Sequence, residues 1–213
     1  MCVAIYKPRH VPTPSLEILE QCWAANPDGA GFAMKTNESK YAIAIHKGFM
    51  SWAGFVRAFE QYHLADFEEE LFLHFRIATH GKVSPGNTHP FCLTEELKLL
   101  RHPDLLTNYA LMHNGMLPIE PRVNGISDTM ELCRRLAKGD FQRNLPAVCE
   151  LLEGFLEHNK IAIMTREQVY LLGEWELLDD VYFSNFHGDW TGFEETLFDT
   201  EWKSTGTAKP RMQ

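Results

Sequence analysis

The sequence predicts a single α+β domain in which helices pack on β-sheets. Short apolar stretches typical of strands come first, amphipathic helices interrupt them, and strands return towards the end. Hydrophobic residues make up 45% of the 213 residues, which is enough for a sizeable core. No linker rich in glycine, serine or proline divides the chain. We therefore expect one domain over residues 1–198, followed by a polar tail over residues 199–213.

The first part of the chain alternates predicted strands with two capped helices. Ser15 and Ser51 each precede apolar residues at helical spacing, and serine is a favoured N-cap residue. Residues 71–78 alternate between two faces, as a strand does. The expected strands cover residues 2–6, 31–35, 41–46 and 71–78.

The second part returns to helices and short strands. Ser127 or Asp128 is expected to open a third helix. A fourth helix is expected over residues 145–156, where one apolar stripe consists of Leu145, Val148, Cys149, Leu152, Phe155 and Leu156. Further short strands are expected over residues 109–113, 161–165, 168–172 and 181–184.

Charge and cysteine content exclude several classes of protein. The net charge of −9 argues against broad affinity for nucleic acid or anionic membranes, because both need a positive surface. No apolar stretch approaches the length of a membrane span. The five cysteines are odd in number and form no CxxC motif, which argues against a disulfide framework. A zinc site on thiolates is improbable for the same reason, and we expect a cytoplasmic protein.

Cys2 directly follows the initiator methionine, and its small side chain permits removal of Met1. Removal would place a thiol and a free α-amine on one residue. The α-amine titrates at about pH 8, so it can act as the base for its own nucleophile. The alternative is an ordinary background cysteine.

Arg76 lies near the end of the predicted strand 71–78, on the face opposite Leu73 and Phe75. A guanidinium group there can hold a carboxylate through two parallel hydrogen bonds. In isolation, an ion pair with one of the acidic residues 68–70 is the simpler interpretation.

Two further motifs each allow a structural and a chemical role. Asn114-Gly115 ends a predicted strand and is typical of a turn, but an amide and a backbone N–H can also stabilise an oxyanion. Ser127-Asp128 is typical of a helix cap, and the Asp128 carboxylate can also bind a substrate ammonium group.

Together these motifs resemble the class II glutamine amidotransferases, members of the N-terminal-nucleophile hydrolase superfamily. They occur in the family's order and at roughly its spacing. The resemblance implies a four-layer αββα fold with two antiparallel sheets between helical layers. The matching stretches are Cys2, Asp28-Gly29-Ala30-Gly31, His74-x-Arg76-x-Ala78-Thr79-His80-Gly81, Asn87-x-His89-Pro90, His113-Asn114-Gly115 and Ser127-Asp128-Thr129.

The resemblance also implies a role for each matching residue. Cys2 would be the nucleophile, and Asn114 and Gly115 would form the oxyanion hole. Arg76 would hold the α-carboxylate of glutamine and Asp128 its α-ammonium group. Two further residues, Thr79 and His80, would line the glutamine pocket, largely through their backbone.

The implied reaction releases ammonia from L-glutamine through a γ-glutamyl thioester and needs no metal or organic cofactor. A separate synthase subunit would accept the ammonia. Three alternatives stay open. The substrate can be another γ-glutamyl amide, or the fold can be a catalytically silent binding module, which retention of Met1 would favour. A zinc site on His74, His80, His89 and His113 lacks carboxylate partners and helical spacing.

Overall fold

The computed structural model describes residues 1–36, 40–79, 81–139 and 141–185. The predicted tail over residues 199–213 and the pocket residue His80 lie outside this part of the chain. No helix among the described residues is long and apolar enough to cross a membrane.

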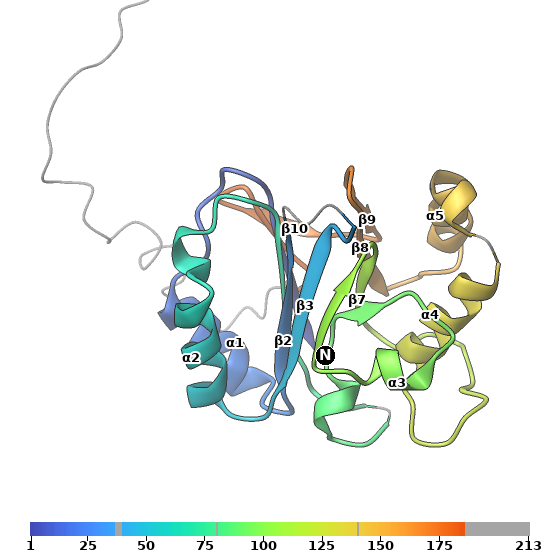
Figure 1. The fold of residues 1–213 in the computed structure, drawn as a ribbon, viewed down its shortest axis with the longest axis horizontal. Helices are drawn as coiled ribbons and strands as arrows, with labels where there is room; N and C mark the ends of the chain where they lie inside the picture. The colour runs from blue at the N-terminus through green and yellow to red at the C-terminus, as the bar shows by residue number, and fades with distance from the viewer. Residues whose placement is uncertain (37–39, 80, 140, 186–213) are drawn as a thin grey trace, which may run out of the picture.

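Two antiparallel sheets form the centre of the described chain (Figure 1). The seven-stranded sheet has the order β10-β11-β1-β4-β2-β3-β6, so the N-terminal strand lies inside it. Its strands are β1 (Val3–Lys7), β2 (Ala30–Lys35), β3 (Ile43–Phe49), β4 (Leu71–Phe75), β6 (Asp104–Thr107), β10 (Glu176–Leu178) and β11 (Val181–Phe183). The four-stranded sheet has the order β5-β7-β8-β9, with β5 (Phe91–Cys92), β7 (Ala110–Asn114), β8 (Lys160–Met164) and β9 (Val169–Leu172).

Helices lie on the outer side of each sheet (Figure 1). Helices α1 (Leu16–Ala25) and α2 (Trp52–Gln61) cover the seven-stranded sheet, whereas α3 (Leu97–Leu100), α4 (Asp128–Lys138) and α5 (Leu145–Glu153) lie beyond the four-stranded sheet. The predicted caps are confirmed, because the hydroxyl oxygens of Ser15, Ser51 and Ser127 accept backbone hydrogen bonds at the starts of α1, α2 and α4. Short 3-10 helices cover Leu64–Asp66, Pro85–Asn87 and Phe141–Arg143.

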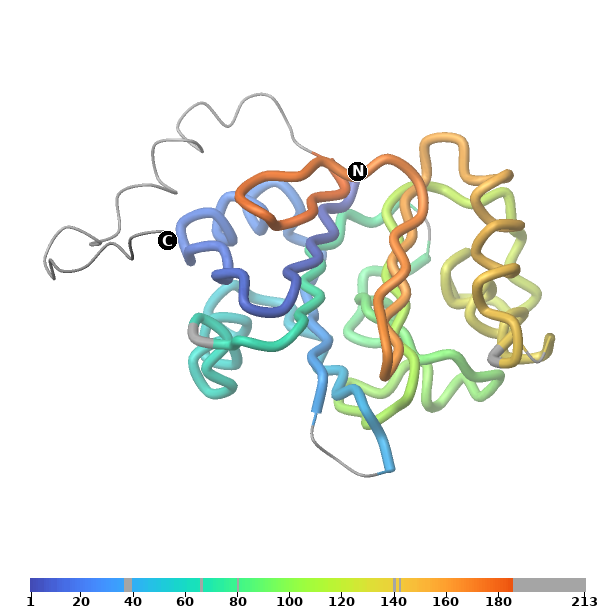
Figure 2. The backbone as a smooth tube through the Cα atoms, turned by 90° about the horizontal axis from the view of Figure 1, so that it is seen from above, coloured from blue at the N-terminus to red at the C-terminus, as the bar shows by residue number. Residues whose placement is uncertain are grey.

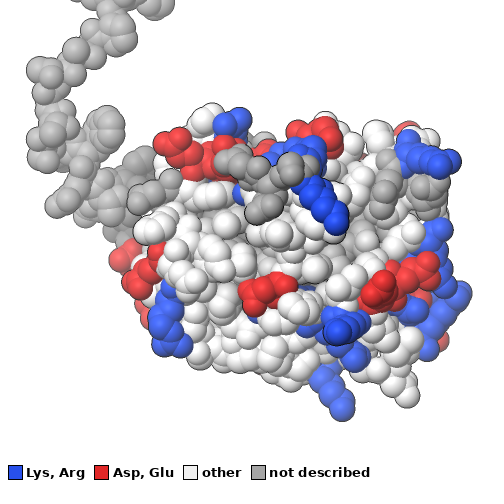
Figure 3. Space-filling view, viewed as in Figure 1, with Lys and Arg blue, Asp and Glu red and all other residues white. Residues whose placement is uncertain are grey.

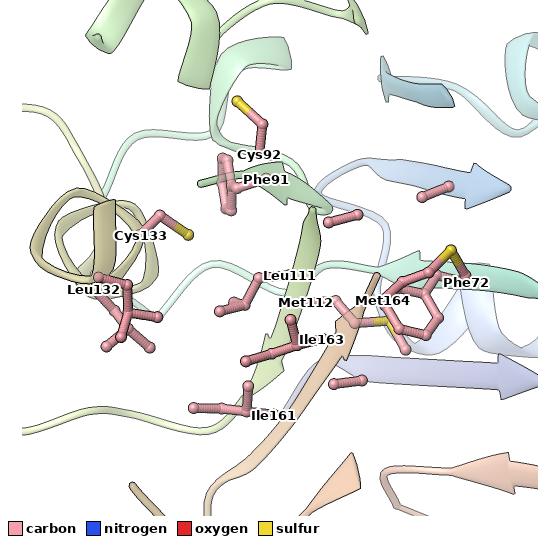
Figure 4. Close-up of a cluster of buried hydrophobic side chains, with 14 of the residues drawn as sticks. Phe72, Phe91, Cys92, Leu111, Met112, Leu132, Cys133, Ile161, Ile163 and Met164 are labelled. Carbon is pink, nitrogen blue, oxygen red and sulfur yellow. The ribbon is translucent and has the colours of Figure 1, made fainter. Parts of the chain in front are cut away.

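Apolar side chains form two cores that the seven-stranded sheet separates. One core fills the space between the sheets and continues to α4, with Phe72, Leu111 and Ile163 buried in it (Figure 4). The other lies between the seven-stranded sheet and helices α1 and α2, and it contains Phe32 and Phe55. Because both faces of this sheet are covered, every residue of β4 is buried, including the polar His74.

The fourth predicted helix is too long and its stripe is partly wrong. Helix α5 ends at Glu153, and Phe155 is 66% exposed. Only Leu145 and Cys149 of α5 are buried, because this helix packs on the edge strand β9 rather than over the middle of the sheet. Strands β5, β6 and β10 and helix α3, which have two to four residues each, are not among the elements predicted from the sequence.

The N-terminus lies beside the last described strands (Figure 2). Strand β1 pairs with β4 on one side and with β11 on the other, with Ile5 opposite both Leu73 and Phe183. This arrangement fixes the position of Cys2, one residue before β1, near the middle of the sheet.

Acidic and basic side chains lie side by side on the face of the molecule seen in Figure 3. Among the described residues on this face there is no extended basic surface of the kind that nucleic-acid binding requires.

Candidate active site

The Cys2 side chain is half-buried at the entrance to β1. Its Sγ atom donates a hydrogen bond to the Ile77 carbonyl oxygen at 3.4 Å, which ties the thiol to the segment after β4. Burial raises the pKa of the thiol, and the nearby positive charge of Arg76 opposes that shift. Met1 precedes Cys2 in the described chain and is 56% exposed.

Arg76 follows β4 directly and is only 3% exposed. Backbone hydrogen bonds fix its position, since its N–H donates to Gly29 O at 2.8 Å and its carbonyl accepts from Asp28 N–H at 2.9 Å. One guanidinium nitrogen donates to Lys82 O at 3.2 Å. Burial lowers the pKa of Arg76, while the negative charges of Asp28 and Asp128 act in the opposite direction.

The ion pair considered for Arg76 is not formed with the neighbouring acidic residues Glu69 and Glu70. Glu69 binds Arg9 at 2.9 Å, and Glu70 binds Lys35. These carboxylates precede β4, whereas Arg76 follows it, so the strand itself separates them.

Asp128 is the first residue of α4, and the preceding Ser127 caps the helix by accepting the Met130 N–H at 3.2 Å. The Asp128 carboxylate accepts hydrogen bonds from Leu117 N–H and Thr129 N–H, both at 2.8 Å. These bonds hold the carboxylate at the helix N-terminus, where the helix dipole favours a negative charge. A carboxylate has about four acceptor positions, so Asp128 can still receive a substrate cation.

Two cavities meet at the thiol, since Cys2, Thr79 and Gly115 line both of them. The inner cavity, of about 20 Å³, adds Arg76 and Asp128 to its walls, together with Ile77, His89, His113, Ser127 and Thr129. The outer cavity has about 300 Å³ and is lined further by Met1, Met116, Glu157, His158 and Asn159. Five of the seven residues predicted to bind or convert the substrate thus come together in one place: Cys2, Arg76, Thr79, Gly115 and Asp128.

Gly115 lines both cavities and lies against Asn159. It has a φ of +132°, and a Cβ atom at this position would lie 2.2 Å from the Asn159 Oδ1 atom. No side chain other than hydrogen fits there without displacing Asn159, which explains why a glycine directly follows β7.

Asn114 is buried but is not among the residues that line the two cavities. Its Nδ2 atom donates to Ser184 Oγ at 2.9 Å and to Asn185 Oδ1 at 3.1 Å. Its own Oδ1 is buried and has no hydrogen-bond partner among the described residues. The predicted amide donor is therefore engaged with the residues that follow β11.

Three buried histidines surround the inner end of the site. The His113 ring contacts Thr129 Oγ1 and Asn159 Oδ1, each at 2.9 Å, and the His74 ring contacts His113 O at 3.1 Å. His89 stacks on His74 with ring centroids 4.1 Å apart. No group of three or more His, Cys, Asp or Glu side chains in the described ranges is arranged to hold a metal ion. His113 instead fixes the loop of Asn159 and the start of α4.

Comparison with known proteins identifies the fold. No protein-family model and no curated protein matches the sequence. Among solved structures, the chain is similar to the glutamine phosphoribosylpyrophosphate amidotransferase from B. subtilis, solved in complex with ADP and GMP, with a TM-score of 0.52 and 18% sequence identity. The two chains share a fold. The match covers 86% of the present chain but only 41% of that chain, so the likeness concerns one part of the larger protein.

Proposed function

We propose that this chain is an amide hydrolase of the class II glutamine amidotransferase type, with the four-layer αββα arrangement of the N-terminal-nucleophile hydrolases. The observation that carries the proposal is that Cys2, Arg76 and Asp128 line one cavity. The fold similarity to a glutamine-dependent amidotransferase supports the same class.

The three groups suit the charges of L-glutamine, which carries a carboxylate and an ammonium group at one end and an amide at the other. Arg76 binds the α-carboxylate and Asp128 the α-ammonium group, which leaves the side-chain amide to reach Cys2. Charge-assisted hydrogen bonds of this kind are roughly twice as strong as neutral ones. Thr79, which lines both cavities, completes the pocket.

The reaction requires removal of Met1, which frees the α-amine of Cys2. The amine takes the thiol proton, Sγ attacks the amide carbon, and the resulting oxyanion receives hydrogen bonds from Gly115 N–H and the Asn114 amide. The C–N bond then breaks and ammonia leaves with the proton from the amine. A water molecule, deprotonated by the amine, cleaves the γ-glutamyl thioester to glutamate and restores the thiol.

No cofactor takes part in this scheme, and a separate synthase subunit in the cytoplasm would accept the ammonia. A second candidate substrate is a different γ-glutamyl amide. The outer cavity of about 300 Å³ favours it, because that space lies against the thiol and exceeds what ammonia needs as a leaving group.

Labelling with 6-diazo-5-oxo-L-norleucine, a glutamine analogue, tests the proposal. Purified protein is expected to lack Met1 and to gain one adduct, mapped to Cys2 by fragmentation mass spectrometry. Cys2→Ala should remove both the adduct and glutamine hydrolysis, whereas Cys149→Ala, which removes a buried cysteine in α5, should label like the wild type. Retained Met1 without an adduct would instead favour the silent binding module.

A further inference from the structure

A buried polar cluster joins the two sheets close to the thiol. It consists of Asn114 at the end of β7, together with Ser184 and Asn185 directly after β11. These three side chains are between 0% and 6% exposed. Burying a polar group destabilises the fold unless the group is hydrogen-bonded. The hydrogen bonds within this cluster therefore determine how its side chains are held.

Ser184 is the centre of the cluster. Its Oγ accepts hydrogen bonds from Ala4 N–H and from Asn114 Nδ2, both at 2.9 Å, and it donates to Asn185 Oδ1 at 3.0 Å. A hydroxyl group has two acceptor positions and one donor, so every hydrogen-bonding position of Ser184 is in use. Its backbone N–H also donates to Ala4 O at 2.8 Å. Ser184 therefore connects the Asn114 amide to the strand that begins next to Cys2.

Asn185 also accepts a hydrogen bond from the Asn114 amide, but its Oδ1 atom does not depend on that bond alone. Its Oδ1 accepts from Asn114 Nδ2 at 3.1 Å and also from the Ser184 hydroxyl. If the Asn114 N–H turned away, the Asn185 oxygen would still keep the hydroxyl bond. The Asn114 Oδ1 atom has no hydrogen-bond partner in the described chain, so the amide is held through its nitrogen alone.

We propose that Ser184 and Asn185 are positioning residues for the Asn114 amide: Ser184 anchors one N–H, and Asn185 holds the other until the oxyanion takes it. The assignment rests on the proposed function, in which Asn114 donates to that oxyanion. When the oxyanion replaces Asn185 as the acceptor, Ser184 keeps all its hydrogen bonds, and only the bond from Asn114 Nδ2 to Asn185 Oδ1 breaks. It explains how a buried amide with both N–H groups engaged can still serve the reaction.

Steady-state glutaminase kinetics of Ser184 variants test this assignment. Loss of an oxyanion donor typically costs about 10²–10³ in rate, and we expect Ser184→Ala, which leaves the donor present but misaligned, to lower kcat at least about 10-fold. The KM should change less than about 3-fold, because Ser184 does not line the substrate cavity. Ser184→Thr keeps the hydroxyl and should recover most of kcat. Asn185→Ala should lower kcat by no more than about 3-fold, because that bond breaks in every cycle.

Thr165→Val is the matched control, since it removes another buried hydroxyl, one that donates to Gln168 O at 2.9 Å between β8 and β9. It should lower the melting temperature without changing kcat. For Ser184→Ala and Asn185→Ala, kcat is measured well below the melting temperature of each variant, so a loss of stability is not mistaken for a loss of alignment. If Ser184→Ala does not fold, Ser184→Cys replaces it: a thiol is a weaker donor and acceptor than a hydroxyl, so kcat should fall below that of Ser184→Thr, and equal kcat in the two variants overturns the assignment.

The assignment is overturned if Ser184→Ala has the kcat of the wild type, or if Thr165→Val loses as much kcat as Ser184→Ala. If Cys2 is still labelled in the wild type, either result leaves the proposed function intact. A larger loss of kcat in Asn185→Ala than in Ser184→Ala overturns the division of roles. Wild-type protein that neither hydrolyses glutamine nor takes the label contradicts both the proposed function and this assignment.

Discussion

Lys47 places an ammonium group inside the molecule, where charge is costly. Its side chain is 4% exposed, its Nζ donates to Leu100 O at 2.6 Å, and it lies 3.8 Å from the centroid of the Phe91 ring. Burial lowers the pKa of Lys47 to about 7. The folded protein therefore holds this lysine partly neutral near pH 7, whereas the unfolded chain holds it charged.

The Lys47 pKa makes stability depend on pH. Between about pH 7 and pH 10 the unfolded chain binds a proton that the folded chain lacks, so the free energy of unfolding rises with pH, by at most about 1.4 kcal/mol per unit from this group. Lys47→Met should flatten that slope in urea titrations at pH 7, 8 and 9. Lys138→Met, which changes an exposed lysine, should leave it unchanged. Equal slopes in wild type and Lys47→Met would refute the expectation.

Local motifs indicated which residues lie near one another, but not the hydrogen bonds that connect them. Cys2, Arg76 and Asp128 each belong to a recognisable local motif, and the three residues line one cavity. Asn159 and Ser184 do not: they are single polar residues, 46 positions from His113 and 70 from Asn114. Contacts at such separations depend on the packing of two sheets, which a single sequence does not reveal.

At the scale of elements, long periodic segments were predictable and short ones were not. The helices that begin after Ser15, Ser51 and Ser127 were identified because a cap and an apolar face agree. Strands β5, β6 and β10 have two to four residues, which is too short for a period of two to emerge. These short strands form because the neighbouring strands have backbone groups that need hydrogen-bond partners.

The caps of α4 and α2 allow a matched comparison. Ser127 and Ser51 each accept a backbone N–H at 3.2 Å, and replacing either by alanine should lower the free energy of unfolding by about 1 kcal/mol in urea titrations. Only Ser127→Ala should also raise the KM for glutamine, because α4 begins with Asp128 and Ser127 lines the inner cavity. A similar KM in both variants would show that the start of α4 does not control substrate binding.

On the scale of the whole molecule, β11 supports both the core and the site. Phe183 is 2% exposed in the core beneath α1 and α2, and the next residue bonds the Asn114 amide. Phe183→Ala should lower the free energy of unfolding by about 3–5 kcal/mol, as large core truncations do. Leu177→Ala on the adjacent β10, where Leu177 is 58% exposed, should change it by less than about 0.5 kcal/mol. Chemical denaturation followed by circular dichroism measures both, and equal effects would contradict this account.

The pairing of β1 with β11 also sets an order of events during synthesis. Ile5 lies opposite Phe183 in the sheet, so one side of the N-terminal strand has no partner until almost all of the described chain has been made. At about 5–20 residues per second, the ribosome needs roughly ten to thirty-five seconds to reach that point. For most of this interval the first residues have left the ribosome and are not yet enclosed by β11. Trimming of Met1 by a cellular aminopeptidase therefore has time to precede the closure of the sheet around the thiol.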